Sequence, residues 1–181
     1  MAHYLLSLGS NRGDRQGYLL QALDQLDAAG VRVVRWASLY ETSPLGVSEQ
    51  PAFLNTAADV VVPDGWQPLW LLQVAKAIEQ RVGRRPSFRW GPREIDIDVV
   101  WWGSADPWRQ ANWRSSQPAL VVPHERIVER LFVLVPLAEI VPGLPIHDRP
   151  VEEWIQRLQE RREQRVYRWA GPSWRGGIQI R

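Results

Sequence analysis

The chain contains no cysteine, one methionine and a single lysine, Lys76. Without cysteine, disulfide bonds, thiolate catalysis and cysteine-ligated zinc are excluded, and no secretory context is implied. No window approaches the ~18 consecutive apolar residues of a membrane-spanning helix, and the first residues lack the basic segment and long apolar run of a signal peptide. We therefore expect a cytoplasmic protein without a membrane partner.

The common phosphate-binding motifs are also missing. The sequence has no G-x-x-x-x-G-K-[ST] loop, no G-x-G-x-x-G turn and no H-R-D or D-F-G set of the protein kinases. Apart from Lys76, the 22 basic residues are arginines, whose planar guanidinium groups suit phosphates and carboxylates. A net charge of +2 permits anionic ligands but does not specify nucleic acid. Phosphate would then have to be held by arginine side chains and by metal.

A chain of 181 residues with 45% hydrophobic residues is long enough for one domain with a sizeable core. Hydrophobic periodicity predicts the following elements. The strands are expected at residues 4–8, 31–40, 53–62 and around the paired aspartates near 96–98, and the helices at 16–29 and 67–82. The resulting β-α-β-β-α-β order is typical of the ferredoxin-like α+β fold, an antiparallel sheet with helices packed on it.

The remainder of the chain is expected to extend this domain, which we assign to residues 1–181 as a whole. We expect a polar insert at about 104–119 and short helices broken by proline over 121–143. A C-terminal helical tail at about 150–181 should begin with an amphipathic helix over 151–165.

The most informative stretch is RWGPREIDIDVVWWG, residues 89–103. Asp96 and Asp98 are separated by a single residue in a run whose alternate positions are aliphatic. Both carboxylates should therefore lie on one face of a strand. Two like charges at roughly 6.6 Å Cα spacing need a compensating cation. Carboxylate oxygens suit Mg²⁺, and the nearby Arg84 and Arg93 can bind phosphate. This arrangement predicts phosphoryl-transfer chemistry.

Two further segments could bind a ligand. Phe53 and Asn55 share one face of an expected strand, where an aromatic ring can stack on a heterocycle and an amide can bind its edge. The alternative is a rigid turn followed by a core phenylalanine. In VPHERIVER, residues 122–130, His124 could donate to a phosphate or simply cap a helix, and Arg126 and Arg130 share a helix face.

Four blocks in order resemble the 6-hydroxymethyl-7,8-dihydropterin pyrophosphokinase family of folate biosynthesis. They are YLLSLGSNRGDR, TSPLGVSEQPAFLN, GRRPSFRWGPREIDIDVV and VPHERIVERLFVLVPLAEIVP, spanning about residues 3–145. The resemblance implies an ATP-dependent diphosphotransferase, in which the pterin hydroxymethyl oxygen attacks the β-phosphorus of ATP and AMP leaves. It further implies ATP as co-substrate and two Mg²⁺ ions. We also expect a monomer without a nucleic-acid partner.

The resemblance also assigns roles to individual residues. Asp96 and Asp98 would be the metal ligands and, with Arg84 and Arg93, the catalytic set. The ATP-site positions are Glu79, Arg84, Trp90, Arg93, His124 and Arg130. The pterin-site positions are Thr42, Leu45, Phe53, Asn55, Trp90 and Phe132, with the pterin between the two phenylalanine rings. Lys76 departs from the family, because bacterial relatives often carry glutamine there near the adenine, and Val121 replaces an expected polar residue.

No protein nucleophile is needed for such a transfer, so catalysis would consist of positioning and electrostatic stabilisation. The loops 43–52 and 83–93 are expected to close over the substrates as lids, because the transfer must exclude water.

Two alternatives belong to other classes. A ferredoxin-like nucleic-acid-binding module would use the same fold, but the aromatic RNP pattern is absent and unmetallated carboxylates would repel phosphate. A metal-dependent phosphohydrolase would need more metal ligands than Asp96 and Asp98, and the sequence has no obvious His/Asp cluster. Detection of AMP as a product formed from ATP and the pterin distinguishes these alternatives from the pyrophosphokinase.

Overall fold

The computed structural model describes residues 2–43, 49–88, 91–116, 119–169, 174 and 177–178. The strands are β1 (His3–Ser10), β2 (Arg32–Trp36), β3 (Tyr40–Thr42), β4 (Phe53–Val61), β5 (Asp96–Ser104), β6 (Arg109–Gln110), β7 (Trp113–Ser116), β8 (Ala119–Val122), β9 (Pro145–Ile146), β10 (Arg149–Pro150), β11 (Val166–Arg168) and β12 (Gly177–Ile178). The helices are α1 (Arg15–Ala28), α2 (Pro68–Val82), α3 (Leu131–Ile140) and α4 (Val151–Arg161), with a 3-10 turn, η1, at Ile127–Glu129. Within the described ranges, no helix has the length and hydropathy needed to span a membrane.

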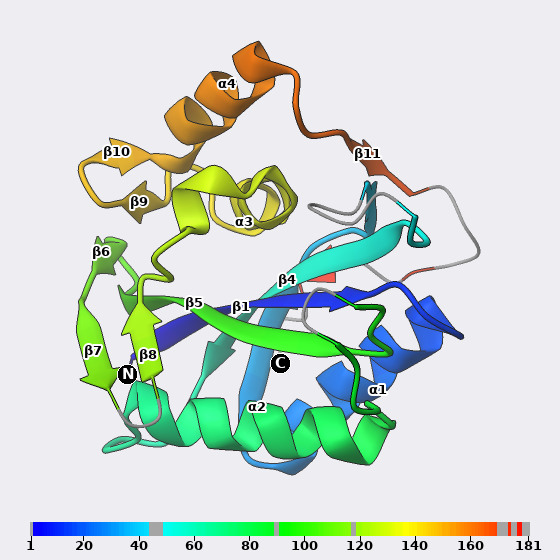
Figure 1. Ribbon diagram of the computed structural model, residues 1–181. Helices are drawn as coiled ribbons and strands as arrows, with labels where there is room; N and C mark the ends of the chain where they lie inside the picture. Colours follow the sequence, from blue (N-terminus) through cyan, green and yellow to red (C-terminus); the bar gives the residue numbers. More distant parts are fainter. Residues whose placement is uncertain are drawn as a thin grey trace.

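An antiparallel sheet divides the molecule into layers (Figure 1). Its strands follow the order β11-β3-β4-β1-β5-β6, while β2 pairs with β4 and β12 pairs with β2. Helices α1 and α2 cover one face, α3 lies against the other, and α4 packs on α3 (Figure 1). The fold is therefore a mixture of α and β elements around an antiparallel sheet.

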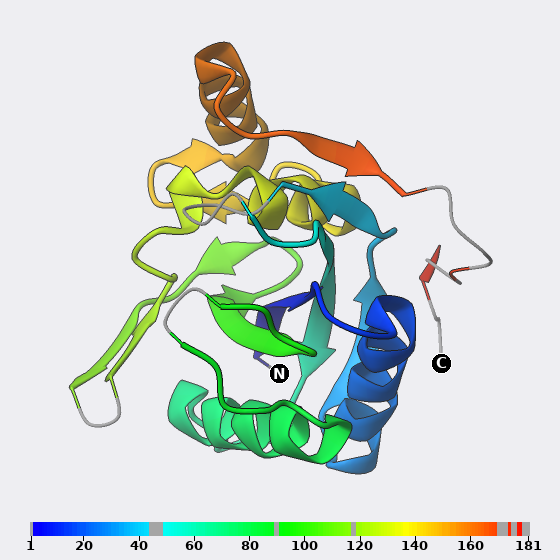
Figure 2. The ribbon, with the colours of Figure 1, turned by 45° about the vertical axis from the view of Figure 1, so that its right-hand side comes forward.

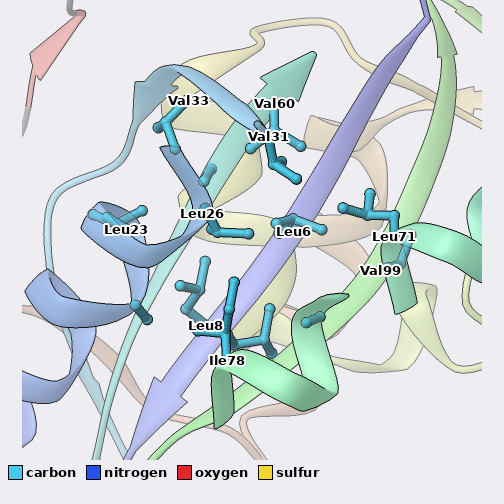
Figure 3. Close-up of a cluster of buried hydrophobic side chains, with 14 of the residues drawn as sticks. Leu6, Leu8, Leu23, Leu26, Val31, Val33, Val60, Leu71, Ile78 and Val99 are labelled. Atoms are coloured by element: carbon cyan, nitrogen blue, oxygen red, sulfur yellow. The ribbon is translucent and has the colours of Figure 1, made fainter. Parts of the chain in front are cut away.

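The first apolar cluster lies between the sheet and helices α1 and α2. Alternate residues of β1, among them Leu6 and Leu8, point toward these helices and meet Leu26 of α1 and Ile78 of α2 (Figure 3). All four side chains are almost completely buried. Burial of one such side chain contributes about 1.5–3 kcal/mol, so this cluster holds the two helices against the strands that carry the cleft residues.

The second apolar cluster lies on the opposite face, beneath α3. A register shift opposite Leu5 and Leu6 of β1 marks a bulge in β5, and Val100 and Trp101 both join this second cluster. Trp101 is fully buried and its Nε1 donates to the Pro145 carbonyl at 2.8 Å. The cluster covers one end of this face, so the end that carries Asp96 and Asp98 stays accessible.

The strand expected at 31–40 is divided into β2 and β3. The backbone N–H and hydroxyl group of Ser38 both donate to Glu139 Oε1 of α3, at 3.0 and 2.8 Å. This pairing takes Ser38 out of the strand ladder, because its amide is bound to a side chain rather than to β4. The prediction of one continuous strand was therefore wrong in this segment.

The prolines do not break the region 121–143 into several short α-helices, as the sequence had suggested. Pro136 lies inside α3, and the helix continues to Ile140. Proline removes a backbone hydrogen bond, but α3 is strongly apolar and packs between the sheet and α4. Packing therefore outweighs the local cost of the proline.

The insert and the tail also differ from expectation. The segment 104–119 contains β6 and β7, and β7 forms a hairpin with β8 that extends from the body of the molecule (Figure 2). Helix α4 ends at Arg161 instead of residue 165, because Arg162 adopts a left-handed φ of 56°. The chain beyond α4 adds β11 to β3 and β12 to β2, so the described part of the tail is a helix followed by two short strands.

Candidate active site

A cleft of about 360 Å³ opens on the sheet face that α3 covers incompletely. Its lining residues come from β1, β3, β4, β5, α2, α3 and the segments that precede β4, β5 and α3. The predicted site residues that line it are Thr42, Phe53, Asn55, Arg84, Arg93, Asp96, Asp98, His124, Arg130 and Phe132. The fold thus brings together residues that are far apart in the sequence.

Strand register places the predicted pterin and metal residues in one row. Gly9 of β1 pairs with Asn55 of β4 on one side and with Asp96 of β5 on the other. Because adjacent strands lie about 4.8 Å apart, the backbones of Asn55 and Asp96 are separated by roughly 10 Å. A Cβ on Gly9 would lie 2.6 Å from Asn55 Oδ1, so glycine keeps the floor of the cleft low between the two side chains.

The Asn55 end of this row is suited to a flat heterocycle. The Asn55 amide donates to Thr42 Oγ1 at 2.7 Å, and both side chains are buried. This hydrogen bond fixes the orientation of the amide plane. The aromatic residues Phe53 and Phe132 line the same cleft, so aromatic walls accompany a fixed amide.

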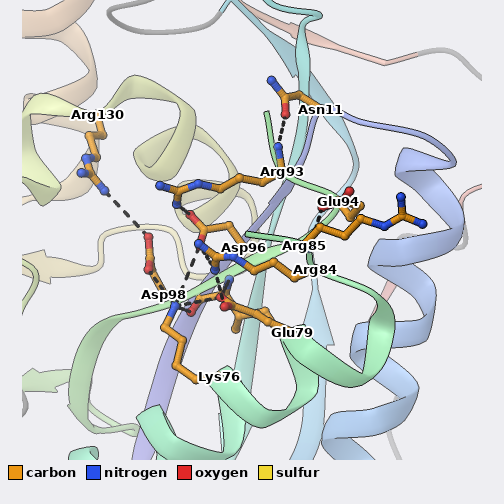
Figure 4. Close-up of polar contacts among 11 residues, drawn as sticks. Asn11, Lys76, Glu79, Arg84, Arg85, Arg93, Glu94, Asp96, Asp98 and Arg130 are labelled. Atoms are coloured by element: carbon orange, nitrogen blue, oxygen red, sulfur yellow. Dashed lines mark hydrogen bonds and ion pairs between the residues drawn. The ribbon is translucent and has the colours of Figure 1, made fainter. Parts of the chain in front are cut away.

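Asp96 is held by two arginines at the other end of the row. Arg84 and Arg93 donate to its two carboxylate oxygens, at 2.8 and 2.7 Å (Figure 4). Burial acts to raise the pKa of Asp96, but the charges of Lys76, Arg93 and Arg84 together outweigh it and hold the pKa below its ordinary value. Asp96 is therefore negatively charged, and the two arginines that bind it, Arg84 and Arg93, could also bind a phosphate group.

Asp98 lacks such partners. No described residue donates a hydrogen bond to the Asp98 carboxylate, and the nearest cationic nitrogens are Lys76 Nζ at 3.8 Å and an Arg130 nitrogen at 3.9 Å. Burial, followed by the charge of Asp96, raises the pKa of Asp98 to about 6. Asp98 is thus the less neutralised carboxylate of the pair, and its hard oxygen atoms are of the kind that binds Mg²⁺.

The described part of the chain has no group of three or more His, Asp or Glu side chains arranged to hold a metal ion. Mg²⁺ commonly binds through one or two carboxylates and takes its other ligands from water and substrate phosphates. The two aspartates therefore fit an ion that arrives with a phosphate-bearing substrate.

Glu79 lies behind β5 and does not line the cleft. Its side chain accepts hydrogen bonds from the Ile97 amide at 2.7 Å, from Lys76 at 2.8 Å and from Arg84. Lys76 in turn donates to the Ile97 carbonyl at 3.1 Å. The α2 side chains thus satisfy the backbone groups that β5 exposes at its edge. The role of Glu79 in ATP binding stays a prediction.

His124 lies beside the sheet, in the segment after β8, where its backbone N–H donates to the Val100 carbonyl of β5 at 2.9 Å. Its Nδ1 accepts from the Arg126 backbone N–H at 3.0 Å. Burial, followed by the charge of Arg130, lowers the pKa of His124 to about 4. The imidazole is therefore neutral near pH 7, with its proton on Nε2, where it could donate to an anionic ligand.

Several cleft residues were not assigned a role from the sequence. Ser7 and Gly9 line the cleft, and their alternation with Leu6 and Leu8 was the available signal. Lys76 also lines it and approaches both aspartates, a position that no local pattern indicates. Two predicted residues, Leu45 and Trp90, lie outside the described residues.

Asn11 joins the two loops that flank the cleft. Its buried side chain accepts from the Arg93 amide at 2.8 Å and donates to Gln50 Oε1 at 3.1 Å and to the Pro51 carbonyl at 3.2 Å. The backbone N–H of Asn11 donates to the Arg93 carbonyl at 3.0 Å. The end of β1 therefore couples the segment after residue 48 to the segment before β5.

Comparison with known proteins gives consistent matches. A chain from Methylorubrum extorquens named 2-amino-4-hydroxy-6-hydroxymethyldihydropteridine pyrophosphokinase is 41% identical over 167 residues, covering 92% of this chain and 99% of its own length. A Bacillus subtilis protein of the same name is 43% identical over 136 residues, 75% of each chain.

Other relatives are longer than this chain. The chain is 39% identical over 150 residues to the mitochondrial folate synthesis bifunctional protein of Arabidopsis thaliana, and the match covers 83% of this chain but 25% of that protein. The crystal structure of Plasmodium falciparum HPPK-DHPS A437G with STZ-DHP superposes with a TM-score of 0.66 at 14% identity. That match covers 88% of this chain and 46% of the other, and it supports the fold alone.

The family description 7,8-dihydro-6-hydroxymethylpterin-pyrophosphokinase (HPPK) matches residues 5–142, which run from within β1 to the end of α3 and include every residue that lines the cleft. The extent of this match, together with the identity to the bacterial relatives, shows that the chain belongs to the HPPK family.

Proposed function

We propose that the chain transfers pyrophosphate from ATP to the hydroxymethyl group of 6-hydroxymethyl-7,8-dihydropterin and releases AMP. The observation that carries this proposal is the row Asn55–Gly9–Asp96, which places an amide suited to the pterin edge beside the carboxylate pair on one sheet face. Membership of the HPPK family and the names of its bacterial relatives support the same substrates.

The pterin would lie at the Asn55 end of the cleft. Phe53 and Phe132 would contact its faces, and the Asn55 amide, oriented by Thr42, would bind its edge. The hydroxymethyl group would then point along the row toward Asp96. Binding in this pose converts the transfer into a reaction between positioned groups, which is where most of the acceleration must come from when no protein nucleophile takes part.

The triphosphate would lie over the carboxylate end. The hydroxymethyl oxygen bonds to the β-phosphorus, the bond from that phosphorus to the bridging oxygen of AMP breaks, and the hydroxyl proton passes to solvent. Arg84 and Arg93, which contact Asp96, would rotate to donate to phosphate oxygens as negative charge shifts to the leaving group. His124 Nε2 and Arg130 would contact the nucleotide from the segment between β8 and α3.

Asp96 and Asp98 would hold two Mg²⁺ ions. When bound, these ions would neutralise part of the negative charge of the triphosphate. We also infer that the core from β1 to β5 is ferredoxin-like. The strand order β3-β4-β1-β5, with α1 and α2 on one face, supports this inference.

The experiment is an assay of the purified chain with ATP, MgCl₂ and 6-hydroxymethyl-7,8-dihydropterin. We expect AMP and the diphosphorylated pterin in equal amounts, measured by chromatography and mass spectrometry, and no AMP when the pterin is omitted. AMP release without pterin would instead indicate a phosphohydrolase, and absence of AMP in the complete mixture would contradict the proposal.

The paired aspartates provide the first prediction. Asp96→Ala and Asp98→Ala should each retain a folded circular dichroism spectrum and lose most activity. Asp98→Asn, which keeps the side-chain volume, should lower kcat by about 10²-fold or more, because charge stabilisation by bound metal accounts for several kcal/mol. Asp64→Asn, which removes a carboxylate from an exposed loop, is the matched control. Near wild-type kcat for Asp98→Asn at saturating Mg²⁺ would refute the metal assignment.

A further inference from the structure

Lys76, the single lysine of the chain, places its ammonium group at the acidic centre of the cleft. Nζ donates to Glu79 Oε1 at 2.8 Å and to the Ile97 carbonyl at 3.1 Å. The same nitrogen lies 3.9 Å from Asp96 Oδ1 and 3.8 Å from Asp98 Oδ1 (Figure 4). One cation therefore faces three carboxylates, and two hydrogen bonds hold it there.

The other cations near the pair are divided between the two aspartates. Arg84 and Arg93 contact Asp96, and Arg130 approaches Asp98. Among the described residues, Lys76 is the one basic side chain within 4.0 Å of both carboxylates. Its position is thus the one where a positive charge most directly offsets the repulsion between them.

We propose that Lys76 is a resident counter-ion of the Asp96–Asp98 pair that makes binding of a divalent cation conditional on ATP. The inference rests on the proposed function, because it assigns to Lys76 the control of the metal that the reaction uses. An ammonium group and a doubly charged ion beside the same carboxylates repel each other. With the ammonium nitrogen and the metal ion roughly 5 Å apart, this repulsion weakens metal binding about tenfold or more, even with strong screening.

ATP removes the conflict. Its triphosphate brings negative charge and additional oxygen ligands for the ion, and it offers the Lys76 ammonium a new partner. The Lys76 side chain is 42% exposed, so it has room to turn toward a phosphate. Metal and nucleotide should therefore bind with positive coupling, and this coupling must be reciprocal.

The test measures binding of Mn²⁺, as a probe of the Mg²⁺ site, by electron paramagnetic resonance in the absence of nucleotide. Lys76→Gln retains hydrogen-bond donors but removes the charge, and we expect it to bind Mn²⁺ about tenfold or more tightly than the wild type. Lys76→Arg keeps the charge and should stay within about threefold of the wild type. Arg81→Gln removes a charge from an exposed position of the same helix and should leave Mn²⁺ affinity unchanged.

The titrations are then repeated with a non-hydrolysable ATP analogue. The difference between wild type and Lys76→Gln should shrink to less than about threefold, because the nucleotide compensates the ammonium in the wild type. Equal or weaker Mn²⁺ binding by nucleotide-free Lys76→Gln would overturn the inference, and so would a difference that persists undiminished with the analogue.

If Lys76→Gln does not fold, the folded wild-type protein offers a second route. Acetylation neutralises its one lysine, and reductive methylation leaves the charge in place, while both reagents also modify the α-amino group. The acetylated protein should bind Mn²⁺ about tenfold more tightly than the methylated protein, and equal affinities would overturn the inference.

A wild type that forms no AMP would refute the proposed function, whereas unchanged Mn²⁺ affinities in an active enzyme would refute the Lys76 inference alone.

Discussion

At the scale of single residues, neighbouring carboxylates in the cleft have different environments. Asp96 accepts hydrogen bonds from two arginines, whereas Asp98 faces Lys76 and Arg130 at 3.8 and 3.9 Å. The difference follows from position, because Asp96 is next to the arginine-bearing loop and Asp98 is one strand repeat further along β5. A cation bound between them would compensate Asp98 first, since the charge of Asp98 is the less neutralised of the two.

His124 gives a prediction about pH at the same scale. Its pKa of about 4 in the folded chain lies below the ordinary value of 6.5, so protons bind more readily to the unfolded chain. The free energy of unfolding should therefore fall as the pH drops from about 6.5 toward 4, and His124→Gln should weaken this dependence. Urea titrations between pH 7.5 and 4.5 measure the effect. Proton NMR showing that His124 titrates near pH 6.5 in the folded protein would contradict the prediction.

Arg93 gives a prediction about catalysis. Its guanidinium group contacts Asp96 at 2.7 Å, which places it beside the proposed phosphate site rather than beside Asn55. Arg93→Ala should lower kcat by about 10²-fold while changing pterin affinity little, because the contact strengthens as charge develops. Arg93→Lys should restore activity in part, since an ammonium cannot reproduce the bidentate fork.

Steady-state kinetics paired with calorimetric pterin titration measure the Arg93 effect. Arg114→Ala, at an exposed position of β7, is the matched control. A large loss of pterin affinity with intact kcat would place Arg93 in the other subsite.

At the scale of elements, the site depends on how β5 is supported. The strand has β1 on one side, and on the other the Ile97 amide and carbonyl are bound by Glu79 and Lys76 of α2. This arrangement satisfies the Ile97 backbone groups on the second side of β5 while leaving the face with the aspartates accessible. Asn11 bonds to Gln50 and Pro51 of one expected lid and to Arg93 of the other. The closing of the loops 43–52 and 83–93 over the substrates stays a prediction.

Loss of the Asn11 side chain should loosen both loops together. Asn11→Ala removes one acceptor and two donated hydrogen bonds at a buried position, so amide exchange in residues 49–52 and 91–93 should accelerate about tenfold or more. Hydrogen-exchange mass spectrometry measures this effect, with the exposed Asn112→Ala as control.

In the wild type, exchange in both loops should slow when pterin and a non-hydrolysable ATP analogue bind together. Unchanged exchange in the ternary complex would argue against lids.

At the scale of the whole molecule, two apolar clusters share one sheet. Strand β1 contributes Leu6 to the cluster under α1 and α2, and Leu5 to the cluster under α3. Neither cluster can separate from the strands without exposing the other, so the two layers should unfold together. The cleft lies where the second cluster ends, and its shape therefore depends on both layers.

Leu134 of α3 tests this coupling, because its side chain is fully buried in the second cluster. Leu134→Ala should lower the free energy of unfolding by about 2–5 kcal/mol. Unfolding followed by tryptophan fluorescence and by far-ultraviolet circular dichroism should still give coincident transitions. The partly exposed Leu20→Ala should change stability by less than about 1 kcal/mol. Two separated transitions would show that the layers unfold independently.

Features that depend on local periodicity could be predicted from the amino-acid sequence. Alternation around Asp96 and Asp98 put both carboxylates on one face, and the helical spacing in α1 and α2 located both helices within a residue or two. Such patterns are local because a strand repeats every two residues and a helix about every 3.6. The four motif blocks also sufficed to indicate the HPPK family, which the comparisons confirm.

Features that depend on contacts between distant segments became visible in the folded chain. Strand register set Asn55, Gly9 and Asp96 in one row, and docking of α2 beside β5 brought Lys76 to the carboxylates. The interruption between β2 and β3 came from Glu139 of α3, a residue about 100 positions away. Local propensity contains no information about such partners, because pairing and burial are set by the packing of the complete chain.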